Sequence, residues 1–336
     1  MKKRKILKWI LVSILFLPFL LAFTGFVYEQ VSRSMAKSKF PIRGKLVDVD
    51  GHRLNIRSLG SSKPVVVFES GLDIGGSLVW SKVQPEISKF ATAVAYDRAG
   101  ILWSERGENP KTCEAIAGEL YKLLKNSGHS GPYILVGHSM AGYMLRSFIK
   151  NHPDEVVGVV FVDVSHPDQL NRFPKEIRAM MATPPEWITD MKSSTGITRW
   201  FASPERYPTT VESDSINQIA NAYMPTSLPA VIEELSNFEK LGIEAGKINS
   251  FGSIPLIVIT GTGEQRMDEF RNMKLGTEFM KEWVKMQTEF LSLSSNSKQI
   301  MADKSGHYVQ LDQPELVIEA VRSIVTGYQH STSLGQ

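Results

Sequence analysis

The sequence predicts an α/β fold built on a mostly parallel, doubly wound sheet. Apolar runs of strand length alternate with segments of helical periodicity along most of the chain, which is typical of a parallel sheet with helices on both faces. Val65–Phe68 is a continuous apolar run, as expected for a strand buried on both sides. Asp50–Gly51, between short strands at 45–49 and 54–59, indicates a hairpin at the start of the sheet. A chain of 336 residues is long enough for one such large domain.

The remaining elements follow the same alternation, with one interruption. Further strands are expected at 91–96, 133–136, 156–164, 255–260 and 299–302, and helices at 78–90, 112–126, 274–292 and from Pro314 onward. Between about 165 and 251, prolines break the chain into short helices without a strand-like run, which indicates a helical cap over the carboxyl ends of the strands. Its large apolar side chains are expected in the core, with an apolar acyl pocket as the alternative: Met180, Met181, Trp187, Met191 and Trp200.

The first 43 residues differ in composition from the rest of the chain. They hold nine lysines and arginines and one acid, Glu29, a net charge of +8, although the whole chain carries only +3. The remainder therefore has a net charge of −5, with no basic excess that would favour nucleic acid. Cysteine and histidine spacings typical of zinc sites are absent from the sequence, so we expect neither a metal nor another cofactor. Cys113 is the only cysteine, which rules out an intramolecular disulfide.

Residues 9–28 predict a membrane anchor. This run carries no charge and follows a basic tail at 1–8, and twenty helical residues can cross a hydrocarbon core of roughly 30 Å. Because basic residues tend to stay in the cytoplasm, we expect a single-pass protein with its N-terminus inside. A polar linker at 29–44 would then lead to an extracytoplasmic domain at 45–330. A signal peptide cleaved near Glu29, giving a secreted protein, is the alternative.

The most informative stretch is Tyr133–Gly142, which reads YILVGHSMAG. An apolar strand runs into a turn of small residues and then into an amphipathic helix, so that Ser139 is held out at the end of the sheet. Small residues are needed beside such a turn because Cβ atoms there would collide with the adjacent backbone. The stretch resembles the nucleophile elbow, usually G-x-S-x-G, of the serine esterase and lipase branch of the α/β-hydrolase fold superfamily. It departs from that pattern in having Ala141 at the fifth position and glycine one residue later, at Gly142.

The resemblance implies a triad of serine, histidine and acid. A serine hydroxyl needs a base to take its proton, and that base needs a third group to orient it. Gly306–His307 follows the last expected strand and precedes a final helix, as the catalytic histidine does in this superfamily, so His307 is the expected base. Two residues compete for the role of the acid. Glu264 lies where the superfamily most often has an aspartate, whereas Asp163 ends the preceding strand, as in lipase-like members. We favour Asp163, because a shorter side chain at a strand end is held more firmly.

An oxyanion formed during attack needs preorganised donors. The backbone N–H of Met140, at the start of the helix after the elbow, is one expected donor. The second is expected from Leu72, in the loop after Val65–Phe68. This chain has Ser70–Gly71 where the family often has His-Gly. Asp97–Arg98–Ala99–Gly100 resembles the superfamily's D-R-x-G stretch, which implies a role in stabilising a loop.

These features predict a membrane-anchored serine hydrolase that cleaves carboxylic esters of small or lipid-like molecules through an acyl-enzyme. An amidase, an acyltransferase or a haloperoxidase-type enzyme on the same fold is the alternative. A non-catalytic binding protein belongs to another class, and its expected signature, a missing serine or histidine, is absent here. Serine at the nucleophile position disfavours haloalkane dehalogenase and epoxide hydrolase chemistry, because those branches of the superfamily use aspartate there. The acyl group, the alcohol and the oligomeric state cannot be read from the sequence.

Overall fold

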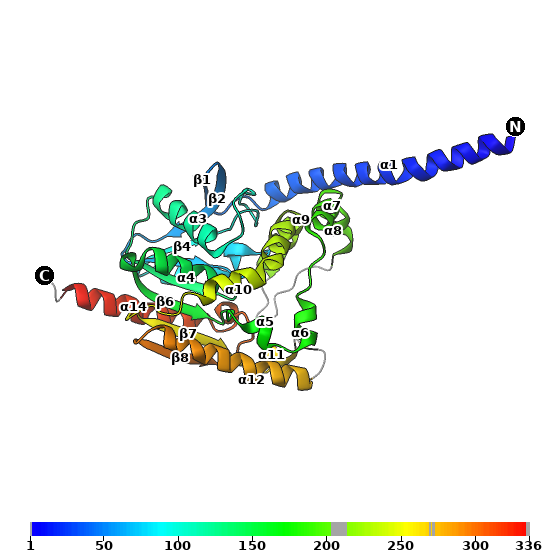
Figure 1. Ribbon diagram of the computed structural model, residues 1–336. Coiled ribbons are helices and arrows are strands. Elements are labelled where there is room, and N and C mark those ends of the chain that lie inside the picture. The colour runs from blue at the N-terminus through cyan, green and yellow to red at the C-terminus, as the bar shows by residue number, and fades with distance from the viewer. Residues whose placement is uncertain (1, 203–213, 269, 271–272, 334–336) are drawn as a thin grey trace.

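The computed structural model describes residues 2–202, 214–268, 270 and 273–333, which form an eight-stranded sheet covered by helices (Figure 1). The strand order is β1-β2-β4-β3-β5-β6-β7-β8. The strands are β1 (Lys45–Val49), β2 (His52–Leu59), β3 (Val65–Glu69), β4 (Thr92–Tyr96), β5 (Tyr133–His138), β6 (Val156–Val162), β7 (Leu256–Gly261) and β8 (Ser297–Ala302). β2 pairs antiparallel with β1 and β4, and all other pairs are parallel. The predicted mostly parallel α/β sheet is confirmed.

Successive residues of the central strands feed two separate cores, one on each face of the sheet. Val66 and Phe68 of β3 pack into one hydrophobic cluster, whereas Val65 and Val67 pack into the other. The side-chain period of 2 in a strand produces this division, and it explains why the run contains no polar residue. Burying both faces requires helices on both sides, which is the doubly wound arrangement.

The helices divide between the two faces accordingly. α3 (Cys113–Asn126) and α4 (Ala141–Asn151) pack on one face, and α2 (Gln84–Ile87) and α14 (Pro314–Ser333) pack on the other. The shorter or later elements are η1 (Gly76–Trp80), η2 (Pro153–Glu155), α11 (Gln265–Asp268), α12 (Met273–Glu289), η3 (Phe290–Leu293) and α13 (Val309–Asp312). The helix expected at 78–90 is therefore split into η1 and α2.

The cap lies between β6 and β7, and the secondary-structure elements described in it are helices. It comprises α5 (Gln169–Arg172), α6 (Lys175–Met180), α7 (Glu186–Ser194), α8 (Ile197–Phe201), α9 (Asp214–Ser236) and α10 (Phe238–Gly246). α9 is longer than the prolines predicted, because it runs through Pro225 and Pro229. Pro229 has no N–H for the carbonyl four residues earlier, and Arg33 Nη2 donates to that Pro225 oxygen at 3.4 Å instead.

The expected membrane anchor requires a correction. Residues 9–28 belong to α1 (Lys2–Lys39), one helix that continues to Lys39 and so includes most of the expected polar linker at 29–44. The C-terminal part of α1 contacts α7 and α9, and its N-terminal part projects away from the domain (Figure 1). Among the helices that the structure describes, none combines the length and the apolar character needed to cross a bilayer. The prediction of a single-pass membrane protein with an extracytoplasmic catalytic domain is therefore wrong.

Contacts with residues far along the chain explain why this segment misled the prediction. Glu29 is fully buried and accepts hydrogen bonds from Arg33 at 2.9 Å and from Arg199 of α8 at 2.8 and 3.0 Å. Arg33 also donates to the Ser193 carbonyl at 3.0 Å. Glycine at position 25 lets α1 approach the cap, since a Cβ there would collide with the Thr195 carbonyl. α1 is thus part of the folded domain from about Gly25 onward.

The large apolar side chains of the cap lie on its surface rather than in the core. Met180, Trp187 and Trp200 are each more than 60% exposed, and Met191 is 44% exposed. Met181 alone of the five is partly buried, against the cluster around Met140 and Tyr143. The expectation of a core role is wrong for the four exposed residues, because the short cap helices bury their small and polar positions, such as Thr189 and Ser193, instead.

Candidate active site

Ser139 lies in a sharp turn between β5 and α4, in the left-handed backbone region, with φ of 55°. This conformation is costly for a residue with a side chain, and it is held here by neighbouring backbone. Ser139 N–H donates to Val162 O at 3.3 Å, and its carbonyl accepts from Ser165 N–H at 2.8 Å. A Cβ at Gly137 would lie 2.6 Å from Leu145, and one at Gly142 would lie 2.9 Å from Val164. The turn therefore requires the small residues that the sequence places there.

Asp163 is the residue directly after β6, which is the strand paired with β5, and it is completely buried. Its backbone is also left-handed, with φ of 47°. Oδ2 lies 2.6 Å from Nδ1 of His307, and Oδ1 accepts hydrogen bonds from Trp283 Nε1 at 2.7 Å and from Gly261 N–H at 3.0 Å. The carboxylate is thus held by three groups from three different elements, and one of them is the imidazole of His307.

Burial and a nearby positive charge act on both members of this pair. Burial raises the pKa of Asp163, but nearby Arg266 and the donors Trp283 and Gly261 oppose that rise by stabilising the carboxylate. Arg266 Nη2 lies 3.5 Å from Asp163 Oδ2. Burial and the positive charge of Arg266 lower the pKa of His307 well below its ordinary value. A neutral imidazole with Nδ1 directed at Asp163 leaves Nε2 able to accept a proton.

His307 lies in the loop after β8 and is also held through its backbone. Nε2 of His138 lies 2.9 Å from the carbonyl oxygen of His307, so that Nε2 carries the proton that it donates. The two rings lie 4.5 Å apart, and Tyr308 packs on His138 at 4.9 Å between ring centroids. The Tyr308 hydroxyl in turn donates to Asp73 at 3.0 Å. His138 thus supports the position of His307 and does not itself contact Asp163 in place of His307.

The rival acid, Glu264, lies elsewhere. It follows β7, as expected from the sequence, but its side chain is exposed to solvent. Its carbonyl accepts the N–H of Met267 in the turn that starts α11. The structure brings Asp163, and not Glu264, into contact with His307.

The loop expected to supply an oxyanion donor passes close to Ser139. A Cβ at Gly71 would lie only 2.6 Å from Cβ of Ser139, so the backbone at Gly71 and Leu72 can approach the serine because position 71 is glycine. Met140 is the N-terminal cap residue of α4, and its N–H belongs to the unpaired first turn of that helix. Both expected donors, Leu72 and Met140, therefore flank the serine.

Three residues of this site were not found from the sequence: Trp283, Arg266 and His138 as a support for His307. Trp283 lies on α12, about 120 residues after Asp163, and the helical pattern that contains it indicates only an amphipathic helix. Its indole N–H could have been suspected from the rule that buried tryptophans find an acceptor, but that rule does not identify the acceptor.

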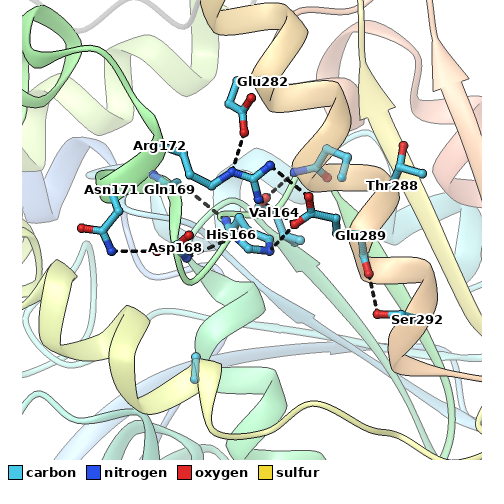
Figure 2. Close-up of polar contacts among 12 residues, drawn as sticks. Val164, His166, Asp168, Gln169, Asn171, Arg172, Glu282, Thr288, Glu289 and Ser292 are labelled. Atoms are coloured by element: carbon cyan, nitrogen blue, oxygen red, sulfur yellow. Dashed lines mark hydrogen bonds and ion pairs between the residues drawn. The ribbon is translucent and has the colours of Figure 1, made fainter.

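A polar cluster ties the chain just after Asp163 to α12 (Figure 2). Arg172 lies between Glu282 and Glu289, with bonds to Glu289 of 2.6 and 2.9 Å and a further bond to Glu282. His166 Nε2 lies 3.4 Å from Glu289, and its Nδ1 accepts the Asp168 N–H at 3.1 Å. α12 therefore carries both the donor to Asp163 and the anchor of the loop that follows it.

A large hollow lies apart from this site. It has a volume of about 1100 Å³ and lies between α1, α7, α9 and the loop after β4, with Arg33, Trp103, Met191 and Tyr223 among its lining residues. Ser139, Asp163 and His307 do not line it. Among the described residues, no three histidine, cysteine or acidic side chains are grouped so that they could hold a metal ion.

The chain is similar in sequence to several known proteins. The chain is 30% identical to the uncharacterized protein YbdG of Bacillus subtilis over 49% of its own length and 51% of YbdG. It is 27% identical to the probable transporter efuK of Hormonema carpetanum over 86% of its own length and 44% of efuK, so it spans about half the length of these two relatives. It is 26% identical to Methylesterase 2 of Arabidopsis thaliana over 54% of its own length and 71% of that protein.

Solved structures share the fold. A thermophilic esterase from Thermogutta terrifontis has a TM-score of 0.60 at 17% identity, over 84% of this chain and 98% of the esterase. The epoxide hydrolase CorEH has a TM-score of 0.62 at 18% identity, over 84% of this chain and 98% of CorEH. Likeness at such identities shows the fold alone. The family model described as alpha/beta hydrolase fold matches residues 63–314, and the chain therefore belongs to the α/β-hydrolase fold family.

Proposed function

We propose that the protein is a serine hydrolase that cleaves carboxylic esters of small molecules through an acyl-enzyme. The observation that carries the proposal is Ser139 in a left-handed turn at the same sheet edge as the Asp163–His307 pair. Membership of the α/β-hydrolase fold family supports hydrolysis in general. Similarity to Methylesterase 2 favours esters over other acyl compounds.

In the proposed reaction, Oγ of Ser139 attacks the ester carbonyl carbon, and its proton moves to Nε2 of His307. Asp163 accepts the hydrogen bond from Nδ1 and stabilises the imidazolium that forms, without itself taking the proton. The backbone N–H groups of Leu72 and Met140 receive the oxyanion. The imidazolium then protonates the departing alkoxide, which leaves as the alcohol. Water, deprotonated by His307, attacks the acyl-enzyme in the same way and releases the carboxylic acid.

A serine nucleophile also bears on the structural likeness to an epoxide hydrolase. Epoxide opening by this fold requires a carboxylate at the nucleophile position, and residue 139 is a serine. The hydroxyl can add to a carbonyl but cannot form the alkyl ester intermediate that such a carboxylate forms. The proposed chemistry is therefore acyl transfer to water.

The decisive experiment compares Ser139→Ala with Ser147→Ala. Ser147 is another buried serine, two turns further along α4, and serves as the matched control. Ser139→Ala should lose p-nitrophenyl ester hydrolysis and labelling by a fluorophosphonate probe while its Tm stays close to the wild-type value. Ser147→Ala should keep both activities. Full labelling of the Ser139→Ala variant would refute the assignment of the nucleophile.

A further inference from the structure

Arg98 is a buried arginine that contacts both the loop beside Ser139 and the cap. It lies in the turn after β4 with 2% of its surface exposed. Nε and Nη2 bind the two oxygens of Glu234, on cap helix α9, at 2.8 and 2.7 Å. Nη1 binds Glu69, at the end of β3, at 2.6 Å. A buried guanidinium with two carboxylates is a strong, directional junction between elements far apart in the sequence.

The remaining N–H groups of Arg98 bind the backbone of the loop after β3. Nη1 donates to Ser70 O at 2.5 Å, and Nη2 donates to Gly71 O at 2.6 Å. All five N–H groups of the guanidinium therefore have acceptors. The two carbonyls belong to consecutive peptide units, so the guanidinium fixes the orientation of both peptide planes.

The orientation of the Gly71 carbonyl determines where the Leu72 N–H points. The peptide bond between them is trans, and in a trans peptide the C=O and the following N–H point in opposite directions. The carbonyl points at Arg98, and the glycine lies against Cβ of Ser139. Rotation of this peptide plane would break the bond to Arg98 and turn the Leu72 N–H away from its present direction.

We propose that Arg98 is a positioning residue that orients the Leu72 N–H as an oxyanion donor and, through Glu234, couples that orientation to the seating of cap helix α9. The inference rests on the proposed serine hydrolase function. It assigns to the Asp97–Gly100 stretch a role in stabilising the transition state, beyond the general stabilisation of a loop. It also gives the cap a route to catalysis that requires no cap residue to touch the substrate.

Lysine cannot replace arginine in this role. Its ammonium is a compact point charge, and it cannot reach two carbonyls and two carboxylates in one plane. Arg98→Lys keeps the positive charge between Glu69 and Glu234 but frees at least one of the two peptide planes. The matched control is Arg146→Lys. Arg146 is also buried, and it donates to the carbonyl of Ile248 at 2.7 Å, but it does not contact the loop after β3.

The test measures kcat and KM for a p-nitrophenyl ester and the inhibition constant of a trifluoromethyl ketone, whose serine adduct carries an oxyanion. Arg98→Lys should lower kcat by about 10²–10³, the cost of losing one oxyanion donor, with KM changed less than threefold. The affinity for the ketone should fall by a similar factor. In Glu234→Gln the amide keeps one acceptor and loses the other, so kcat and the affinity for the ketone should each fall about tenfold. Arg146→Lys should change neither kcat nor that affinity.

Each outcome separates positioning from a merely structural role. If Arg98→Lys folds poorly, Glu234→Gln at wild-type Tm carries the test with the same two readouts. The proposal is overturned if the ketone binds the Arg98→Lys and Glu234→Gln variants as tightly as the wild type, or if Arg146→Lys loses as much as Arg98→Lys. The Ser139→Ala experiment tests the proposed hydrolase function separately. If the Ser139→Ala variant were still labelled, the proposed function would be wrong, whatever the Arg98 variants show.

Discussion

Replacing Asp163 with asparagine tests the proposed acid and removes one charge with almost no change in volume. The structure determines how the new amide would lie. Its oxygen has to face Trp283 and Gly261, whose N–H groups both donate to Oδ1 at 2.7 and 3.0 Å. Turning the NH₂ group toward them would place it against two buried donors, at a cost of about 1–3 kcal/mol each. The NH₂ group therefore faces His307.

An NH₂ group facing Nδ1 forces the wrong tautomer of His307. Nδ1 then has to accept a hydrogen bond, so the imidazole proton moves to Nε2, and Nε2 can no longer take the proton of Ser139. Loss of such an acid lowers kcat by roughly 10³–10⁴, which is about 4–5 kcal/mol at 1.36 kcal/mol per decade. KM should change much less, because the ground-state contacts of the substrate remain.

The fold should survive this substitution. Burial raises the pKa of Asp163, so a neutral amide avoids the cost of burying a charge there, and this gain offsets part of the loss of the ion pair with Arg266 at 3.5 Å. The assay is p-nitrophenyl ester turnover with Tm measured on the same samples. Glu264→Gln is the matched control; its exposed side chain should keep activity within about tenfold, or near 1.4 kcal/mol. A well-folded Asp163→Asn variant that is fully active, beside an inactive Glu264→Gln variant, would refute the reasoning.

Two other predictions concern histidines. His307→Ala should lower kcat by several orders of magnitude, whereas His152→Ala, which removes only a ring stacked on α3, should not; an active His307→Ala with an inactive His138→Ala would contradict this. Burial lowers the pKa of His166 to about 4, so the unfolded chain takes up the proton first and stability falls as the pH drops from about 6.5 toward 4. His166→Gln, measured by urea unfolding, should lose less stability over that range, by on the order of 1–2 kcal/mol once solvent screening is allowed for. An unchanged slope would show that His166 does not titrate as the structure implies.

The sequence was informative where the chemistry is local. The elbow at Ser139 is defined by a few neighbouring residues, and so is the histidine after the last strand. Both could therefore be predicted from short sequence patterns. The parallel sheet could be predicted because each of its inner strands is a short apolar run, as burial on both faces requires. The choice between Asp163 and Glu264 depends instead on how the ends of three different strands and α12 meet. The residues next to Asp163 and Glu264 in the sequence do not indicate how these elements pack together.

Longer-range contacts explain the errors as well. Residues 9–28 fit a membrane span when they are read alone, and the residues that tie the following turns of α1 to the cap, such as Arg199, lie far along the chain. The prolines of α9 predicted breaks, but a side chain from α1 supplies the donor that one of them lacks. The junction of Arg98 with Glu234 spans 136 residues, and neither residue has a local pattern that names its partner.

Ser139 and Asp163 are held by neighbouring central strands, whereas His307 is not. They follow residues paired across β5 and β6, His138 and Val162, and both have left-handed backbones, a conformation that costs about 1–3 kcal/mol each. Ser139 N–H binds Val162 O, and Ser165 N–H binds Ser139 O, so the two strained turns brace each other. The proposed nucleophile and the proposed acid are therefore held together by backbone hydrogen bonds. His307 comes from beyond β8, two strands away from β6, and reaches that pair only through a loop, the bond to Asp163 and the contact with His138. The histidine, which has to pass a proton from the serine to the leaving alcohol, is thus the one member of the proposed triad that is not built into the central strands.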